Sequence, residues 1–451
     1  MRTCSFLILL TLSQTLVLSQ FAQGEDEFER PPISYRASTP VNEVSHLQDR
    51  MDRGEVSLKF DAEKGYLQSV LDALEIPVSS QVLVYSKTSL QARRISPRTP
   101  RALYFNDDVY LGYCHAGDKL EITVMDPRLG AVFYTLGQTE VEKPHLLRQT
   151  DDCLTCHSSS RTDGVPGLLA RSLFVNATGF PIFSGGSQNV DHTTPLQKRW
   201  GGWYVTGKHG DQQHQGNLII RAQTVPREVD NSQGQNVVDL SDRFKVDNYL
   251  TPHSDIVSLM VLEHQLIVHN RMVKASFTTQ QALDYEITMN RALNEPENQR
   301  RESTTRRIQN AGDALIETLL LRNEAELTGP IEGTSGFTEE FVSRGPRDSK
   351  GRSLRDFDLN RRLFKYPCSF LIYSIAFNKL PDEMKDYVWQ ELWEILANNK
   401  KAEEYAYLTP EDRTAIIEIL RETKANDLPE CWGMHKTAHH ESVSIPYGQL
   451  K

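Results

Sequence analysis

Cys153, Cys156 and His157 have residue types and a spacing that can carry out chemistry. They form the run Cys-Leu-Thr-Cys-His, which is the attachment signature of a c-type haem. On a helical turn, residues i, i+3 and i+4 share one face, so the three side chains can meet one flat partner. The two thiols can form thioether bonds to the vinyl groups of a porphyrin while the imidazole reaches its iron. With 6 Cys and 13 His in 451 residues, chance would give this run in about two of every thousand such chains.

Two other interpretations of the run are a thiol redox pair and half of a zinc site. Tetrahedral zinc needs a second pair of closely spaced ligands, and the sequence has no other Cys-x-x-Cys. A redox pair does not need the histidine. We therefore predict one covalent haem c, bound through Cys153 and Cys156, with His157 as the proximal iron ligand.

The N-terminus is typical of an exported protein. Arg2 gives a short basic region, an apolar stretch follows over residues 6–18, and Ala22-Gln23-Gly24 is a small-x-small cleavage site. The apolar stretch is too short and too polar to favour a membrane span. We therefore predict a signal peptide over residues 1–24 and a periplasmic or secreted mature protein without a membrane span. Export agrees with the haem prediction, because c-type haem is attached outside the cytoplasm.

The second axial ligand of the iron decides between an electron carrier and a haem enzyme. We call residues 153–157 the haem turn. A methionine soon after it would favour a carrier, but no Met lies between Met125 and Met260. The candidates for this distal position are His192, His209, His214, Met260 and His264. Met260 and His264 are i and i+4 on a predicted helix and share one face. For each candidate, an ordinary core, surface or hydrogen-bonding role is the alternative.

Glycines and tryptophans are interleaved over residues 199–210, Arg-Trp-Gly-Gly-Trp-Tyr-Val-Thr-Gly-Lys-His-Gly. Glycine beside a bulky ring permits close backbone approach, which a porphyrin edge or a tight strand crossing would require. A glycine-bulged hairpin with tryptophans in the core explains this tryptophan segment equally well.

The apolar pattern predicts an α+β fold, with a β-rich N-terminal half that carries the haem turn and a mostly helical C-terminal half. Short β-prone runs separated by turn residues lie at 81–85, 102–105, 109–113, 120–124 and 131–136. Helical spacing predicts helices at about 63–74, 255–277, 280–293, 297–323, 367–378, 382–397 and 410–424. Ser254 is the predicted N-cap of the second helix, and Thr409 with Pro410 at the first helical position is the predicted start of the last one. Residues 329–352 are predicted to form a loop.

These patterns divide the chain into six parts. They are a signal peptide (1–24), a linker or extended arm (25–57), a β-rich N-terminal region (58–147), a haem-binding cytochrome c-like region (148–250), a helical region (251–430) and an irregular tail (431–451).

The net charge bears on the kind of partner, and the remaining cysteines bear on disulfide formation. The formal net charge is −10, which argues against nucleic acid or an anionic membrane as the partner and is compatible with docking to a basic redox protein. Outside the haem motif and the signal peptide, the cysteines are Cys114, Cys368 and Cys431. An oxidising compartment allows one disulfide, for which Cys368 and Cys431 are the preferred pair. Free buried cysteines are the alternative.

Several stretches resemble a family of large, secreted bacterial proteins described as cytochrome c domain-containing. They are the haem turn, Asp-His-Thr-Thr-Pro at 191–195, the tryptophan segment, the predicted helix at 254–264, and residues 101–136 and 366–396. The resemblance implies covalent haem and export, with Cys153, Cys156 and His157 as the haem-binding residues. It implies no particular reaction. Unlike the small cytochromes c, this chain carries its haem turn inside a much larger α/β body.

The sequence therefore predicts an exported monohaem c-type cytochrome that transfers electrons to or from a redox partner protein. A haem enzyme of peroxidase or oxidase type is the first alternative, with a distal histidine or Arg199 as acid–base group beside an open iron site. The length of the chain favours this alternative, since a carrier needs far fewer residues. A haem-bearing sensor or subunit of a larger redox complex is the second.

Overall fold

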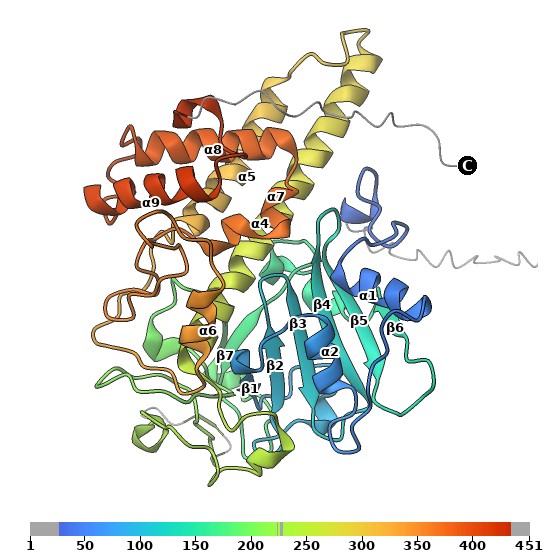
Figure 1. The fold of residues 1–451 in the computed structure, drawn as a ribbon, viewed down its shortest axis with the longest axis vertical. Helices are drawn as coiled ribbons and strands as arrows, with labels where there is room; N and C mark the ends of the chain where they lie inside the picture. The colour runs from blue at the N-terminus through green and yellow to red at the C-terminus, as the bar shows by residue number, and fades with distance from the viewer. Residues whose placement is uncertain (1–26, 223, 226–228, 434–451) are drawn as a thin grey trace, which may run out of the picture.

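A seven-stranded antiparallel sheet forms the centre of the N-terminal half (Figure 1). The computed structural model describes residues 27–222, 224–225 and 229–433. The strands are β1 (Val82–Val84), β2 (Arg101–Phe105), β3 (Val109–Cys114), β4 (Lys119–Asp126), β5 (Gly130–Gly137), β6 (Leu146–Gln149) and β9 (Trp203–Tyr204). With 36% helix and 14% strand, the fold is α+β, as the sequence predicts. The five β-prone runs are the strands β1 to β5.

The two faces of this sheet differ because side chains alternate along each strand. In β4, Leu120 and Ile122 are buried on the face covered by α1 (Glu43–Asp52) and α2 (Leu67–Ala73). Glu121 points to the opposite face and is partly exposed. We call this opposite face the outer face. It carries Arg101, Leu103, Gly112, Glu121, Thr123, Phe133 and Thr135.

The chain between β6 and β9 runs from one edge of the sheet to the other. The strand order is β6-β5-β4-β3-β2-β1-β9, so residues 150–202 leave at one edge and rejoin at the opposite edge. Within this stretch, β7 (Ala170–Leu173) and β8 (Ser187–Val190) form a separate two-stranded sheet. The predicted regions 58–147 and 148–250 therefore share one sheet and one hydrophobic core.

One long helix, α4 (Ile256–Ala292), links the sheet to the helical half. Asp255 is its N-cap, because the Asp255 Oδ1 atom accepts the N–H groups of Val257 and Ser258 at 2.8 and 3.1 Å. The prediction of Ser254 as the N-cap is wrong, since its hydroxyl donates to the carbonyl oxygen of Tyr204 in β9 instead. The predicted break after residue 277 is absent as well. The Thr279 hydroxyl bonds the carbonyl one turn earlier and starts no new helix.

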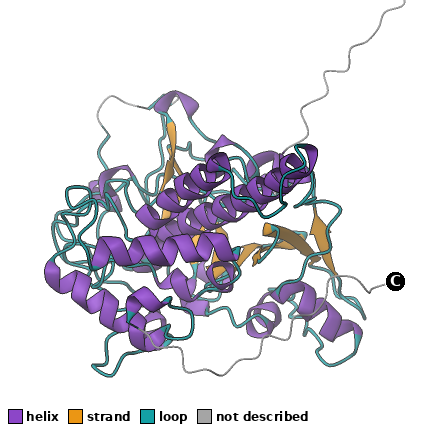
Figure 2. Ribbon diagram, turned by 90° about the horizontal axis from the view of Figure 1, so that it is seen from above, coloured by secondary structure: helices purple, strands orange, loops and turns teal. Residues whose placement is uncertain are grey.

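The other helices of the C-terminal half form one group with α4 (Figure 2): the first four contact α4 itself, and the last contacts the helix before it. They are α5 (Glu302–Leu319), α6 (Phe337–Ser343), α7 (Ile375–Asn378), α8 (Asp382–Leu396) and α9 (Pro410–Thr423). α9 begins as predicted, with Thr409 as N-cap and Pro410 in the first turn. α6 falls inside the predicted loop 329–352. Its aromatic residues Phe337 and Phe341 are buried in the core, which explains why a helix forms in a polar, glycine-rich stretch.

The segment predicted as a linker or extended arm, 25–57, is packed in the structure over its described residues. Ile33 and Tyr35 are fully buried, and Val44 and Leu47 bury one side of α1 against the sheet. Asn42 closes a capping box at the start of this helix. The prediction was wrong because four well-spaced apolar residues anchor a stretch that is otherwise polar.

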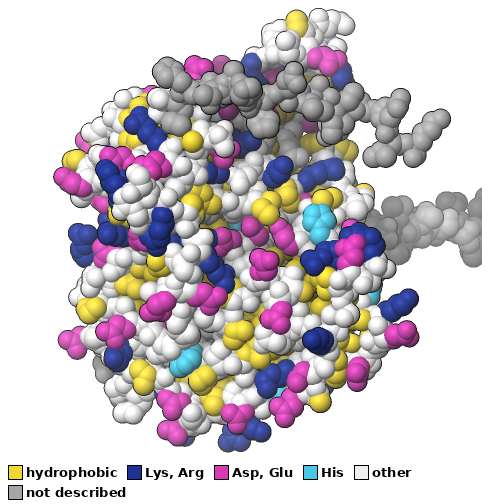
Figure 3. Space-filling model, viewed as in Figure 1, with side chains coloured by type: hydrophobic (Ala, Val, Ile, Leu, Met, Phe, Trp, Pro, Cys, Tyr) yellow, Lys and Arg dark blue, Asp and Glu magenta, His cyan; other side chains and the backbone are white. Residues whose placement is uncertain are grey.

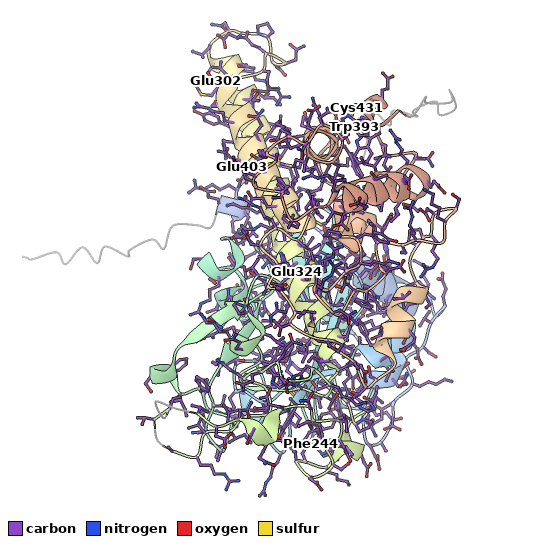
Figure 4. The ribbon with its side chains drawn as sticks, turned by 90° about the vertical axis from the view of Figure 1, so that its left-hand side faces the viewer. Phe244, Glu302, Glu324, Trp393, Glu403 and Cys431 are labelled. Carbon is purple, nitrogen blue, oxygen red and sulfur yellow. The ribbon has the colours of Figure 1, made fainter. Side chains whose placement is uncertain are left out.

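The prediction of a disulfide between Cys368 and Cys431 is also wrong. Cys368 is fully buried, Cys431 is exposed, and both are free thiols. In Figure 4, Cys431 is labelled close to Trp393, on which its neighbour Trp432 packs with ring centroids 5.3 Å apart. The predicted signal peptide and nearly all of the predicted tail, with His435, His439 and His440, lie outside the described residues.

Two surface properties bear on partners. No helix in residues 27–222, 224–225 and 229–433 is both long and apolar enough to cross a bilayer. On the face shown in Figure 3, acidic and basic side chains are interspersed, so neither sign of charge forms a continuous patch there.

Candidate haem site

The haem motif forms a helical turn. α3 (Leu154–His157) begins directly after Cys153, whose φ of −69° and ψ of −43° are already helical. The N–H groups of Cys156 and His157 bond the Cys153 carbonyl at 3.2 and 2.9 Å. The predicted i, i+3, i+4 arrangement is therefore present, and all three side chains project from one turn.

The two thiols of the motif are free, and they differ in exposure. Cys156 is exposed, whereas Cys153 is half-buried against the hydrophobic core. Burial raises the pKa of Cys153 to about 11, so its sulfur is a neutral thiol at pH 7. Two unbridged sulfurs on one helical turn are what two thioether bonds to a porphyrin require.

The imidazole of His157 is fixed through one of its nitrogens. Its Nδ1 atom lies 2.9 Å from the carbonyl oxygen of Gly167. A carbonyl oxygen only accepts, so Nδ1 carries the proton and Nε2 is left with its lone pair. Burial lowers the pKa of His157, which also favours the neutral ring. A neutral imidazole with one oriented nitrogen is the form that binds iron.

The haem turn lies at the outer face of the sheet. The ring of His157 packs against Phe133 of β5, with centroids 5.0 Å apart. Arg101 of β2 and Glu121 of β4 form an ion pair at 2.5 Å. Besides the larger effect of burial, the charge of Arg101 lowers the pKa of His157 and the charge of Glu121 raises it. The outer face thus places an aromatic ring and a guanidinium beside the motif.

Arg101 and Gly112 give this face a feature that suits a propionate-bearing ring. The Nε atom of Arg101 is buried and has no hydrogen-bond partner among the described residues. A Cβ atom at Gly112 would lie 2.2 Å from the Arg101 guanidinium, so a larger residue there would require the guanidinium to move. An unused N–H donor on a cation beside the haem turn can serve a haem carboxylate. The residues present therefore fit the cofactor that the motif predicts.

A loop over residues 158–168 holds the turn against α4. Asn270 of α4 clamps it, because its side chain accepts the Leu168 N–H at 2.8 Å and donates to the Leu168 carbonyl at 2.7 Å. Arg271 pairs with Asp163 of the same loop at 2.9 Å. Since the neighbouring Gly167 carbonyl orients His157, Asn270 positions this predicted iron ligand indirectly.

Replacing Asn270 by Ala is expected to destabilise the protein by about 2–6 kcal/mol, since two buried backbone groups lose their partners at about 1–3 kcal/mol each. Denaturant unfolding of N270A and wild type measures the change. Lys274→Ala, one turn further along α4, is the matched control and should change stability little. Equal stability of N270A and wild type would show that the clamp does not hold the loop.

The tryptophan segment packs in the core beside β7. Trp200 and Trp203 are 1% and 6% exposed. A Cβ at Gly201 would lie 2.7 Å from the Leu173 carbonyl oxygen, so this glycine allows β7 to cross at close range. The interpretation as a tight strand crossing with buried tryptophans is the one that these contacts support.

Four of the distal candidates form two buried histidine pairs. The Nδ1 atoms of His192 and His264 are 3.2 Å apart, and the His264 Nε2 atom lies 2.8 Å from the Ser369 hydroxyl. Both nitrogens of His264 are therefore engaged. Burial lowers the pKa of His192 to about 4, so the pair is neutral at pH 7.

The second pair consists of His209 and His214, whose ring centroids are 4.8 Å apart. Their nitrogens accept backbone N–H groups, Nε2 of His209 from Asn236 and Nδ1 of His214 from Gly216, both at 3.0 Å. Burial lowers the pKa of His214 to about 3. These bonds give both rings a structural role in the loop that follows the tryptophan segment.

None of the five distal candidates makes a hydrogen bond or ring contact with His157 within the described part of the chain. Met260 is 2% exposed in the core. His264 lies six residues before Asn270 on α4, which is about 9 Å along the axis. The structure thus brings together Cys153, Cys156 and His157, and it leaves the distal candidates in other contacts.

Arg199, the predicted acid–base group of the enzyme alternative, is buried and fully engaged. It pairs with Glu263 at 3.0 Å and donates to the carbonyl oxygens of Thr194 and His192 at 2.6 and 3.0 Å. A guanidinium held in this way supports the packing of the loop around residue 192 against α4.

Sequence reasoning missed Asn270, Gly167 and Arg101. Gly167 lies ten residues after the motif and acts through its backbone carbonyl, so its residue type gives no signal. Asn270 sits inside an apolar helical pattern, where a polar residue among buried neighbours was the available clue. Arg101 alternates with apolar residues in a strand, and this pattern predicts a solvent-facing side chain.

Comparisons with protein families, with characterised proteins and with solved structures find no match to this chain.

Proposed function

We propose that this protein is an exported monohaem c-type cytochrome that acts in electron transfer. Cys153 and Cys156 bind one haem covalently, and His157 is its proximal axial ligand. The observation that carries the proposal is the hydrogen bond from His157 Nδ1 to the Gly167 carbonyl. It fixes the ring on the same turn as two free cysteines and leaves Nε2 available.

When bound, haem supplies a one-electron ferric/ferrous couple. The residues of this chain then have distinct tasks. The two sulfurs fix the ring in place, and His157 sets the basicity of one axial ligand through its carbonyl partner. Phe133 lies against the imidazole and restricts water there, and Arg101 offers an N–H donor to a carboxylate. Burial and hydrogen bonding of this kind are the means by which a protein sets the potential of such a couple.

The chain would act outside the cytoplasm, with a redox protein as its partner. A signal peptide over residues 1–24 and the requirement for haem attachment after export support this location. An excess of acidic residues, which gives the net charge of −10, suits a basic partner surface.

A potentiometric titration of protein matured with haem-attachment machinery tests the proposal. We expect one reversible one-electron wave and a pyridine haemochrome that gives one haem per chain. Protein that carries one haem but shows no reversible wave, and that reacts rapidly with peroxide, would replace the carrier by the haem-enzyme alternative. The absorption bands of the oxidised and reduced forms would report the spin state and hence the distal ligand.

A further inference from the structure

Two arginines lie beside the exposed sulfur of Cys156. Arg161 belongs to the short 3-10 helix that follows the haem turn, and its carbonyl oxygen accepts the side-chain amide of Asn189 at 3.0 Å. Asn189 of β8 is the cross-strand partner of Arg171 in β7, and paired residues have Cα atoms about 5 Å apart. The ribbon of β7 and β8 therefore holds Arg171 next to the segment that carries Arg161.

Neither guanidinium is neutralised by a carboxylate of residues 27–222, 224–225 or 229–433. Arg171 donates to the neutral hydroxyl of Ser187, from Nε at 3.1 Å. Burial lowers the pKa of Arg171, and the charge of Arg161 lowers it further, which agrees with two like charges close together. The carboxylates near the haem turn pair with other cations, in the pairs Asp151–Arg36, Glu121–Arg101 and Asp163–Arg271. Within the described part of the chain, the charges of both arginines are therefore left for a ligand.

The two sulfurs of the haem motif have different surroundings. Cys153 is half-buried, and besides burial the charges of Glu121 and Asp152 raise its pKa. Cys156 is exposed, and a thiolate at this position opposes the effect of burial on the pKa of Arg171. A haem attached to both sulfurs would therefore meet solvent, and hence a partner protein, on the basic side of the haem turn.

An exposed aromatic ring lies in the connection between β7 and β8. Phe183 is 70% exposed, which is the largest exposed fraction among the large hydrophobic side chains of the described residues. It lies four residues before Ser187, the residue that Arg171 bonds. Arginine and aromatic residues are enriched in protein–protein interfaces. The composition here is therefore typical of an interface, and we call Arg161, Arg171 and Phe183 the docking surface.

The charge of the docking surface is opposite to that of the whole chain. The net charge of −10 governs solubility and long-range attraction. Screening limits the reach of an exposed charge to about 8 Å at physiological ionic strength, so docking depends on the charges within the contact. On the Cys156 side of the haem turn these charges are the two guanidiniums, and carboxylates are their complement.

We propose that the docking surface binds an acidic redox protein. Carboxylates of the partner pair with Arg161 and Arg171, and Phe183 packs into the contact. One electron passes between the partner and the haem iron on the Cys156 side, so that one of them is oxidised as the other is reduced. This inference rests on the proposed electron-transfer function and names the kind of partner that meets the haem turn.

Electron transfer to small charged oxidants tests the local charge. Stopped-flow kinetics measure oxidation of the ferrous, full-length mature protein by ferricyanide, an anion, and by tris(phenanthroline)cobalt(III), a cation. We expect the ferricyanide rate constant to fall as ionic strength rises above about 0.1 M, where the fields of distant charges are screened. Arg161→Gln/Arg171→Gln should slow ferricyanide at least threefold and leave the cobalt reagent no slower. Arg306→Gln, which changes an exposed arginine of α5, is the control and should leave both rates unchanged.

Equal midpoint potentials of the three proteins show that the driving force is the same. A wild-type ferricyanide rate constant that rises with ionic strength, or one that the double replacement does not change, would overturn the proposal.

Binding of an acidic peptide tests the docking surface independently of redox activity. Calorimetry at low salt should show that decaglutamate binds wild type and Arg306→Gln at least tenfold more tightly than Arg161→Gln/Arg171→Gln, with thermal unfolding as the check that each variant is folded. Equal binding by the double variant, or no binding by wild type, would overturn the proposal even in a protein with a reversible redox wave. Absence of that wave with decaglutamate binding intact would instead overturn the proposed function, while the preference of the docking surface for acidic partners would stand.

Discussion

Replacing Cys153 and Cys156 together by serine is expected to abolish covalent haem attachment. Both sulfurs of the haem motif lie on one helical turn, and serine oxygen forms no thioether with a vinyl group. Intact mass should fall from that of the chain plus one haem to that of the bare polypeptide. Visible absorption should fall to the level of protein produced without attachment machinery. Each single replacement leaves one bond and should reduce, rather than remove, the yield of coloured protein.

The exposed Cys431 provides the matched control for this experiment. Cys431→Ser removes a free thiol that takes no part in the motif, and it should leave mass shift and colour intact. His157→Ala should retain the covalent haem but change the absorption bands, because the sulfurs remain while an axial ligand is lost. Colourless wild-type protein with the mass of the bare chain, after correct export, would contradict the proposed function.

Replacing Arg199 by Met is expected to destabilise the protein by about 3–5 kcal/mol, because it leaves Glu263 buried without its cation. The Arg199 Nη1 to Glu263 Oε2 distance is 3.0 Å, and the two side chains are 3% and 1% exposed. Denaturant unfolding of both proteins gives the difference. The doubly neutral variant Arg199→Met/Glu263→Gln should recover a large part of it, since no uncompensated charge remains.

The pH dependence of this loss follows from the pKa of Glu263. Burial raises that pKa above its ordinary value even beside Arg199, and removing the cation raises it further. A folded-state pKa above the unfolded one means that stability is greatest below the unfolded pKa and falls as pH rises through the folded pKa. The loss in R199M should therefore be larger at pH 9 than at pH 6. A loss that shrank with rising pH would show that Glu263 is not the source.

Local patterns were sufficient for the helical turn that carries the motif and for most regular elements. Cys153, Cys156 and His157 are close in sequence, so their common turn follows from spacing alone. The strands β1 to β5 were predicted because turn residues separate their β-prone runs. The start of α9 was predicted because Thr409 and Pro410 are neighbours that act on the same turn.

Features that depend on distant parts of the chain were not predictable in this way. Asn270 acts on a loop about one hundred residues earlier in the sequence. The helix α1 looked like part of a linker, since its stability comes from burying Val44 and Leu47 against a sheet formed later in the chain. The disulfide between Cys368 and Cys431 was inferred from their positions along the sequence, which say nothing of the depth at which each thiol lies.

The path of residues 150–202 from one edge of the sheet to the other limits how the segment that carries the motif could be inherited or transplanted. Six spacings of about 4.8 Å separate the outermost strands, or about 29 Å in all. At 3.3–3.6 Å per extended residue, a replacement would need about nine residues merely to reconnect the chain. A haem unit joined by one flexible tether could be gained or lost between related proteins without harm to its host. Here the segment and the sheet depend on each other, so we expect relatives to keep both or neither.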